Sequence, residues 1–345
     1  MKKFLAILLC ACMALTLVAC NAEKEYKLGM GVVVSMDSSK TENAQVDATV
    51  ATVVLDADGK IVACRIDVAQ NKMAVTGGAV DAAKTFETKM ELGDRYGMAG
   101  KVDNDGNGVM KEWYEQTKAF EAYVVGKTVA EVEAIETKEA NGHQIAVDQA
   151  LLDAGCSMQI TDFIAAVVAA CKDEQGVSFK TAAEFTLGVA AKTSAADSAA
   201  ATAEADGTVA MYSDFAATVI ADGKIIAALN DAIQPKITIN TAGEIVSAAY
   251  TATKRNLKEG YNMAAYGQSM DWNGDGKVLE WYLQSAEFSK YVVGKSADEV
   301  ANLATKEVEG KGYVISADDA LLNAGCTIQI TSIKAVMAQA AKNAR

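Results

Sequence analysis

The chain has 345 residues, of which 32 are Lys or Arg and 45 are Asp or Glu, and its formal net charge is −13. A surface this acidic argues against nucleic acid as a partner and against adhesion to an anionic bilayer through a basic patch. The one histidine, His143, stands in a turn-like Asn-Gly-His segment. It gives no support for a Ser-His-Asp or Cys-His mechanism or a His-ligated metal, so a conventional hydrolase is the weakest function class.

The N-terminal segment is typical of an exported protein. Lys2 and Lys3 precede a short apolar run and then small residues, which predicts a secretory signal over residues 1–19. The Leu-Val-Ala-Cys ending resembles a bacterial lipobox, which implies lipidation of the Cys20 sulfur and an anchored segment over residues 20–23. The alternative is an ordinary signal peptide. We therefore expect an extracytoplasmic protein, held on the cell membrane by its lipid anchor.

Strands are predicted first and helices after them. Period-two alternation rich in Val, Thr and Ile predicts strands at Gly31–Met36, Val46–Leu55 and Ile61–Ile66, with a turn at Asp56–Gly59. Helical spacing of apolar residues predicts helices at Glu112–Val125, Thr128–Ile135, Asp148–Leu152 and Phe163–Cys171. This order favours an α+β fold, in which a small antiparallel sheet packs against helices.

A loop rich in aspartate precedes the first long helix. Its oxygen-bearing side chains at alternate positions are Asp103, Asp105 and Asn107, and they recur later in the chain as Asp271, Asn273 and Asp275. The spacing matches the first half of an EF-hand loop, but position twelve is Tyr rather than Glu. Two interpretations stay open: a structural Ca²⁺ that holds the helix entry, or an Asx-turn that caps the helix without metal.

A run of small residues comes before the last predicted helix. Ala154, Gly155 and Cys156 lead to Ser157, and alternating apolar residues then predict a short strand, Met158–Thr161. Small residues offer little side-chain cover, so we expect the hydroxyl to be reachable. From the residues alone, the run is a tight turn into a strand, and its cysteine is a buried small hydrophobe.

The whole series of motifs occurs twice. Asp-Gly-Lys-Ile occurs at 58–61 and 222–225, Glu-Trp-Tyr at 112–114 and 280–282, and Tyr-Val-Val-Gly-Lys at 123–127 and 291–295. The small run at 151–161 returns at 321–331, where Gly325 and Thr327 match Gly155 and Ser157. We predict two tandem homologous domains, 24–174 and 178–345, with residues 192–206 forming an extended surface loop.

The repeated residues resemble the exported FMN-binding domain family. Both copies carry the resemblance, through the three runs just named and through Thr-Lys followed by Tyr-x-Met at 88–98 and 253–263. The chain is most similar to tandem-domain, flavin-carrying surface lipoproteins of Gram-positive extracellular electron transfer. In that family a flavin transferase joins the FMN phosphate to a hydroxyl that ends a Ser-Gly-Ala-Thr-like run. The resemblance implies FMN on Thr327 or Ser157, beside Gly325 or Gly155.

Two functional hypotheses follow. In the first, the chain is a lipid-anchored FMN carrier that relays electrons between unidentified redox partners, rather than an enzyme that turns over a substrate. In the second, it is a flavin-free binding or structural lipoprotein of the cell envelope, with calcium in its Asp loops.

Overall fold

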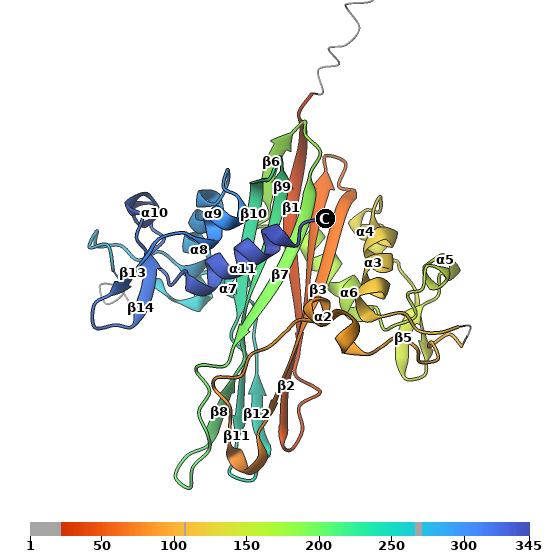
Figure 1. The fold of residues 1–345 in the computed structure, drawn as a ribbon, viewed down its shortest axis with the longest axis horizontal. Coiled ribbons are helices and arrows are strands. Elements are labelled where there is room, and N and C mark those ends of the chain that lie inside the picture. The colour runs from red at the N-terminus through yellow and green to blue at the C-terminus, as the bar shows by residue number, and fades with distance from the viewer. Residues whose placement is uncertain (1–21, 107, 266–270) are drawn as a thin grey trace, which may run out of the picture.

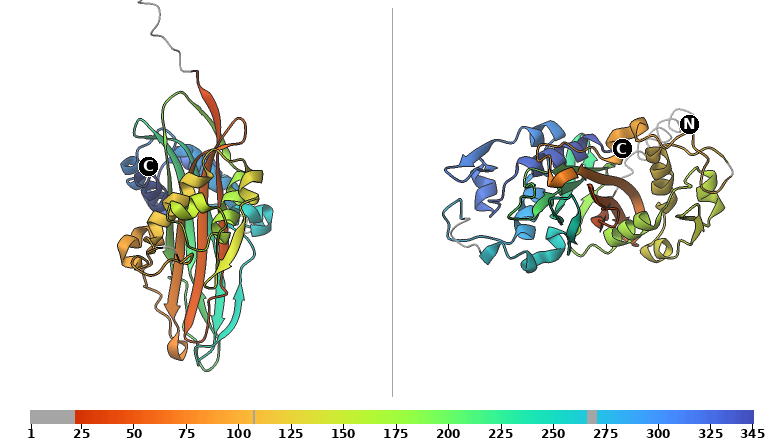
Figure 2. Two further views of the ribbon diagram at one scale, coloured as in Figure 1. Left: turned by 90° about the vertical axis from the view of Figure 1, so that its right-hand side faces the viewer. Right: turned by 90° about the horizontal axis from the view of Figure 1, so that it is seen from below.

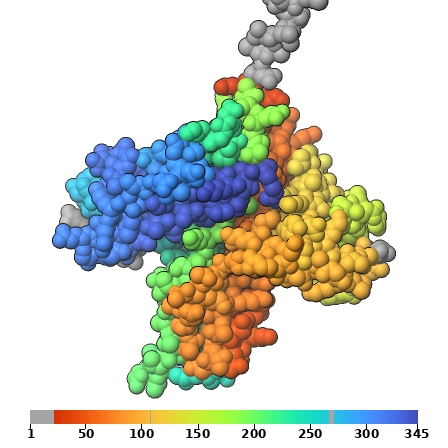
Figure 3. All heavy atoms as spheres, viewed as in Figure 1, coloured from red at the N-terminus to blue at the C-terminus, as the bar shows by residue number. Residues whose placement is uncertain are grey.

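The computed structural model describes residues 22–106, 108–265 and 271–345. They form a mixed α+β fold, as predicted, with antiparallel sheets at the centre and helices on either side (Figure 1). The helices that follow each sheet gather in a lobe of their own, and the two lobes lie on opposite sides of the strands (Figure 2). The space-filling view shows strands extending below both lobes (Figure 3). Within the described residues, no helix is both long and apolar enough to cross a membrane.

The first sheet is made of long strands in the order β3-β2-β1-β6, all antiparallel. Its strands are β1 Lys24–Ser35, β2 Asn43–Asp56, β3 Ile61–Ala74 and β6 Val177–Thr181. Gly59, with φ of +75°, makes the predicted turn between β2 and β3. Strand β6 lies at the start of the predicted second domain, 178–345, yet it pairs with β1, so residues assigned to the second domain complete the first sheet.

The second sheet repeats the β3-β2-β1 part of this order but is interrupted. Strands β7 Thr186–Ser194, β9 Tyr212–Ala221 and β10 Lys224–Ile233 pair in the order β10-β9-β7. Pro235, the only proline of the sequence, then offers no N–H to the ladder. Beyond this point a separate sheet forms in the order β12-β11-β8. Its strands are β8 Gly207–Ala210, β11 Lys236–Ile239 and β12 Ile245–Ala249. Asn71 stands at the matched place, and there β3 is continuous.

The helical elements follow each sheet in the same order. The first set is α2 Lys89–Leu92, α3 Trp113–Val124, α4 Val129–Glu133, the hairpin β4 Thr137–Ala140 and β5 His143–Ala146, α5 Gln149–Asp153 and α6 Thr161–Cys171. The second set is α7 Lys254–Leu257, α8 Trp281–Tyr291, α9 Ala297–Ala301, the hairpin β13 Thr305–Val308 and β14 Tyr313–Ser316, α10 Asp319–Asn323 and α11 Thr331–Lys342. Short 3-10 turns are η1 Thr76–Gly78, η2 Gly93–Tyr96 and η3 Lys258–Tyr261.

Each sheet buries both of its faces, because successive side chains along a strand point to opposite sides. One face packs on the other sheet, with Leu28 and Val50 against Phe215 and Leu229 in one core. The opposite faces pack on α3 and α6 in the first half and on α8 and α11 in the second. Edge strand β3 lies beside β7, and β6 beside β10. The layers are therefore helix, sheet, sheet and helix, and the sheets meet at a β3/β7 seam and a β6/β10 seam.

Glycine lets the last helix of each half approach its sheet closely. A Cβ placed on Gly29 would lie 2.1 Å from the carbonyl oxygen of Ala170 in α6. A Cβ on Gly188 would lie 1.9 Å from the carbonyl oxygen of Ala340 in α11. Because the helices lie this close to the sheets, the residues that follow α6 and α11 lie at the seams between the two sheets.

Two sequence predictions are wrong. Met158–Thr161 is not a strand, because the N–H of Met158 goes to the Gln116 side chain and that of Ile160 to the Gln144 carbonyl, so no strand ladder forms. Both apolar side chains of that segment are buried, which explains the strand-like alternation. The loop predicted over 192–206 is shorter, since residues 192–194 belong to β7.

Candidate functional site

The small run forms a glycine-dependent turn in both halves, and its hydroxyls are not reachable. Gly155 has φ of +91° and Gly325 has φ of +94°, a region that favours glycine. Ser157 is only 4% exposed and Thr327 only 3%. The expectation of little side-chain cover is therefore wrong, because side chains distant in sequence fold over the run.

A glutamine of the long helix holds the first copy of the run. The Oε1 atom of Gln116 accepts the N–H groups of Ser157 and Met158, each at 3.0 Å. Its Nε2 atom donates to the carbonyl of Lys111 at 2.8 Å. One buried amide thus satisfies three backbone groups and ties the run to α3.

The second copy is held in the same way by Gln284. Its Oε1 atom accepts the N–H of Thr327 at 2.8 Å and the hydroxyl of Thr327 at 3.3 Å. Its Nε2 atom donates to the carbonyl of Leu279 at 2.7 Å. Sequence reasoning missed both glutamines, although each stands two residues after a Glu-Trp-Tyr run.

Covalent FMN does not fit the run as it is folded. A Cβ at Gly155 would lie 2.6 Å from Nζ of Lys111, and one at Gly325 would lie 2.5 Å from Cδ1 of Leu279. These side chains fill the space above the glycines. The Thr327 hydroxyl already donates to an amide, and an aliphatic side chain, not a cation, covers its glycine. A phosphodiester would need this hydroxyl to turn outward.

The Asp loops lie against the small run and are closed by their own backbone. Oδ1 of Asp103 accepts the N–H of Gly108 at 3.1 Å. The Asp271 carboxylate accepts three N–H groups, from residues 274, 275 and 276. The Asn273 amide nitrogen donates to the Leu322 carbonyl at 3.1 Å, whereas its Oδ1 atom is buried and has no hydrogen-bond partner among the described residues.

These contacts agree with the Asx-turn interpretation of the loops. Asp105 and Asp275 lie in the same loops, whereas Asn107 is outside the described residues. In the part of the chain that the structure describes, no three His, Cys, Asp or Glu side chains gather to hold a metal ion. Calcium at these loops stays a prediction.

The residues that carry the flavin-family resemblance make structural contacts with one another. Trp113 and Trp281 are 2% and 3% exposed and belong to the cores under the helices. The Glu112 carboxylate accepts the N–H groups of Met98 and Ala99, at 3.1 and 3.0 Å. Glu280 does the same for residues 263 and 264, at 2.8 and 3.0 Å. The Glu-Trp-Tyr and Tyr-x-Met motifs are therefore partners in one packing arrangement.

A buried aspartate supports the first short helix of each half. Asp67 Oδ1 accepts the N–H groups of Val68 and Met90, at 2.7 and 3.1 Å. Burial raises the pKa of Asp67 to about 7 despite these hydrogen bonds. Asp231 makes the same pair of contacts with residues 232 and 255, and burial also raises its pKa.

The cysteines of the described residues are free and chemically quiet. Cys156 and Cys326 are fully buried, as predicted. Burial raises the pKa of both thiols to about 12, which keeps them protonated at neutral pH. Cys20, the predicted lipidation site, lies outside the described residues.

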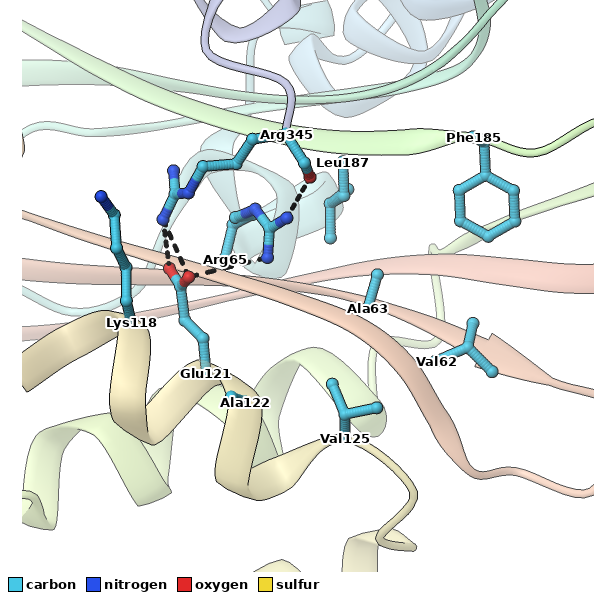
Figure 4. Close-up of a pocket in the computed structure, with 10 residues that line it drawn as sticks. All are labelled: Val62, Ala63, Arg65, Lys118, Glu121, Ala122, Val125, Phe185, Leu187 and Arg345. Carbon is cyan, nitrogen blue, oxygen red and sulfur yellow. Dashed lines mark hydrogen bonds and ion pairs between the residues drawn. The ribbon is translucent and has the colours of Figure 1, made fainter. Parts of the chain in front are cut away.

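A cavity of about 640 Å³ opens at the β3/β7 seam (Figure 4). Strand β3, helix α3, the start of β7 and Arg345 line it. Figure 4 shows the charged side chains Arg65, Lys118, Glu121 and Arg345 at one end. The apolar side chains of Val62, Val125 and Phe185 lie at the other end. Sequence reasoning missed this site, because residues far apart in the chain come together there.

The charged end is organised around Glu121. Arg345 Nη2 donates to both of its carboxylate oxygens, at 3.1 and 2.8 Å, and Arg65 Nη1 lies 3.6 Å from Oε2. Arg65 also donates to the backbone oxygens of Cys64 and Arg345. Burial raises the pKa of Glu121 and outweighs the attraction of the two arginines. Burial likewise lowers the pKa of Arg65.

Some donors at this end are unused. The Nε atom of Arg65 is buried and has no hydrogen-bond partner. The Lys118 amine lies 4.9 Å from the centre of the Tyr114 ring and has no ion-pair partner among the described residues. With Arg65, Lys118 and Arg345 around a single carboxylate side chain, the side chains at this end of the cavity carry excess positive charge on an acidic chain.

The matched positions of the second half carry no charge. Leu229, Ala286 and Ser289 stand where the first half has Arg65, Lys118 and Glu121. The Ser289 hydroxyl donates to Oδ1 of Asn230 at 2.8 Å, in place of the ion pairs. The charges of β3 and α3 at this cavity are thus a property of the first half only.

Comparison with known proteins gives one partial similarity. No family model matches the chain, and no solved structure matches it. A chlorophenol reductase of Desulfitobacterium hafniense is 32% identical in an alignment of 158 residues that covers 40% of this chain. The chain spans about half the length of that protein, since the aligned residues make up 46% of it.

Proposed function

We propose that this chain is an extracytoplasmic, lipid-anchored binding protein of the cell envelope, built from two tandem homologous domains, whose ligand site is the β3/β7 seam cavity. The anchor rests on the lipobox that ends at Cys20, and the two domains rest on the repeated motifs. The proposal assigns a structural role to the small run and moves the ligand site to the seam.

The observation that carries the proposal is that polar groups are satisfied by hydrogen bonds at the small run, whereas some are left without partners at the seam cavity. At the small run, Gln116 and Gln284 take up the N–H groups of the turn, and the hydroxyl residues are buried. At the seam, donors of Arg65 and Lys118 are unused at one end of the cavity, and Val62 and Val125, which are 37% and 47% exposed, lie at the other end. Apolar walls with a few convergent polar groups are typical of small-molecule sites, and the volume lies in their usual range.

A thermal-shift screen of small molecules against the mature protein tests this site, because a ligand that binds the folded state raises the melting temperature. We expect stabilising ligands whose effect is lost in Ala122→Trp, which fills the cavity from α3. The same ligands should still stabilise Lys290→Trp, the matched position on α8. Ligands that stabilise Ala122→Trp as much as the wild type would contradict the proposed site.

A second candidate function is an FMN-dependent electron carrier. The observation in its favour is the resemblance of the repeated motifs to the exported FMN-binding domain family. It requires the Thr327 hydroxyl to leave Gln284. Flavin fluorescence of the protein after electrophoresis, with a flavin transferase co-expressed, tests it. A fluorescent band that disappears in Thr327→Val but stays in Ser157→Ala would support this function, and a dark band would reject it.

A further inference from the structure

We propose that the β3/β7 seam cavity binds an amphipathic monoanion, a small carboxylic acid with an apolar body, held by its acid group at the end of the cavity where Lys118 lies. This inference rests on the proposed function and adds the chemical class of the ligand. It is argued from the polarity, the charge balance and the capacity of the cavity.

The cavity is polarised along its length. Figure 4 shows Lys118 and the two arginines at one end, and Phe185 with Val62 at the other. The apolar end buries hydrocarbon favourably, whereas a charged group placed there would lose its hydration without compensation. A ligand that satisfies both ends has its charge at one extremity and an apolar body behind it.

The charge balance selects an anion. Glu121 is the one carboxylate side chain that lines the cavity, and it already accepts from Arg345 and from the N–H of Ile66. A cationic ligand would have to displace Arg345 from it. An anion instead meets the amine of Lys118, which has no ion-pair partner among the described residues. Charge-assisted hydrogen bonds of this kind are among the stronger polar contacts.

The pairing of the cations limits the ligand to one anionic group. Both arginines lie beside the Glu121 carboxylate, so Lys118 is the one cationic side chain of the cavity lining without a carboxylate partner. One such cation suits the single charge of a carboxylate. A dianion such as a phosphate monoester would keep part of its charge unpaired beside Glu121, which disfavours it.

Decanoate is a suitable probe, with decanol and decyltrimethylammonium as the neutral and cationic matches of the same length. We expect isothermal titration of the mature protein to detect decanoate, and to show much weaker binding of the other two. Lys118→Ala, which introduces the residue found at the matched position 286, should weaken decanoate binding about tenfold through loss of one charge-assisted hydrogen bond. Lys290→Ala, a lysine on α8 away from the cavity, should leave the affinity unchanged.

The outcomes separate the ligand class from the site. Equal binding of decanol and decanoate, blocked by Ala122→Trp, would overturn the anion class while the site stands. Tighter binding of the cation, or an unchanged affinity in both Lys118→Ala and Lys118→Gln, would also overturn it. If no probe binds while the wider screen returns a ligand blocked by Ala122→Trp, the class fails and the proposed function survives. If neither binds, both fail.

Discussion

The two seams between the sheets are closed in different ways. At the β6/β10 seam, Arg255 Nη2 donates to both oxygens of Asp173, at 3.1 and 3.0 Å, and neither side chain is more than 6% exposed. At the β3/β7 seam, Arg345 pairs with Glu121 but stays 34% exposed, and a cavity opens beside the pair. The two sheets are therefore joined by a buried ion pair at the β6/β10 seam, whereas the β3/β7 seam contains a cavity that could hold a ligand.

The same contrast appears between the two halves. Their internal supports match: a glutamine under the small run, a glutamate over the Tyr-x-Met turn and a buried aspartate behind the first short helix. Their surfaces differ, because Arg65, Lys118 and Glu121 of the first half are replaced by neutral residues at the matched positions of the second half. The two halves therefore share their internal hydrogen bonds and differ in their surface charges.

The largest expected effect is at the locked seam. Arg255→Met would leave the Asp173 carboxylate buried without its cation, which costs about 3–5 kcal/mol of unfolding free energy. Arg345→Met removes a partly exposed partner, and Arg65 remains beside Glu121, so we expect a loss of about 1 kcal/mol. Urea unfolding of both variants measures the difference. Equal losses would remove the distinction between the seams.

The shared frame predicts a similar loss from either glutamine. Gln116→Leu leaves the N–H groups of Ser157 and Met158 buried without an acceptor, and we expect a loss of about 3 kcal/mol, since each such group costs about 1–3 kcal/mol. Gln284→Leu should match it in equilibrium unfolding. Gln149→Leu, on the exposed side of α5, should change stability by less than about 0.5 kcal/mol. A loss of stability in only one of the two glutamine variants would contradict the equivalent roles of Gln116 and Gln284.

The buried aspartate predicts a pH dependence of stability. Because the folded pKa of Asp67 is raised to about 7, the folded state holds the proton more tightly than the unfolded state, whose pKa is ordinary. Stability is therefore lost as pH rises between these two values. Between pH 5 and 7 the wild type should lose about 2 kcal/mol relative to Asp67→Asn. Parallel urea titrations that show no such divergence would contradict the burial of a titrating carboxyl.

The smallest predicted effect is at the strand break. Residues 211–213 and 234–236 flank Pro235 and lack a continuous ladder, whereas the matched residues 46–48 and 70–72 lie in unbroken β2 and β3. One missing backbone hydrogen bond corresponds to roughly fivefold faster local exchange. Amide hydrogen exchange should therefore be about that much faster at the break. Equal protection at the two places would mean that Pro235 does not divide the second sheet.

Local elements were predictable from the sequence, whereas the site was not. Period-two alternation located β1 and β2, and the capping box of Thr128 and Glu131 gave the start of α4. The strand predicted at Met158–Thr161 failed because burial on two sides imitates strand alternation. The hydroxyl of Thr327 was expected to be reachable because its neighbours in sequence are small, yet Leu279 covers the run from a distance.

The seam cavity depends on contacts that no local pattern carries. Arg65 and Arg345 are 280 residues apart in the chain and meet only because α11 crosses β7 and ends at the edge of β3. The sequence shows the charge difference between the halves, at Lys118 against Ala286, but only the fold shows that Lys118 lines a cavity. The repeated motifs could therefore be predicted from the sequence, and the site could not.

Peptide mass mapping of the protein, made in cells that contain a flavin transferase, tests the central claim most directly. The claim is that the small run is a structural turn and that ligands bind at the seam. We predict that the peptides containing Ser157 and Thr327 carry no added mass. A phosphodiester-linked FMN on either peptide would contradict the account and return the functional site to the small run.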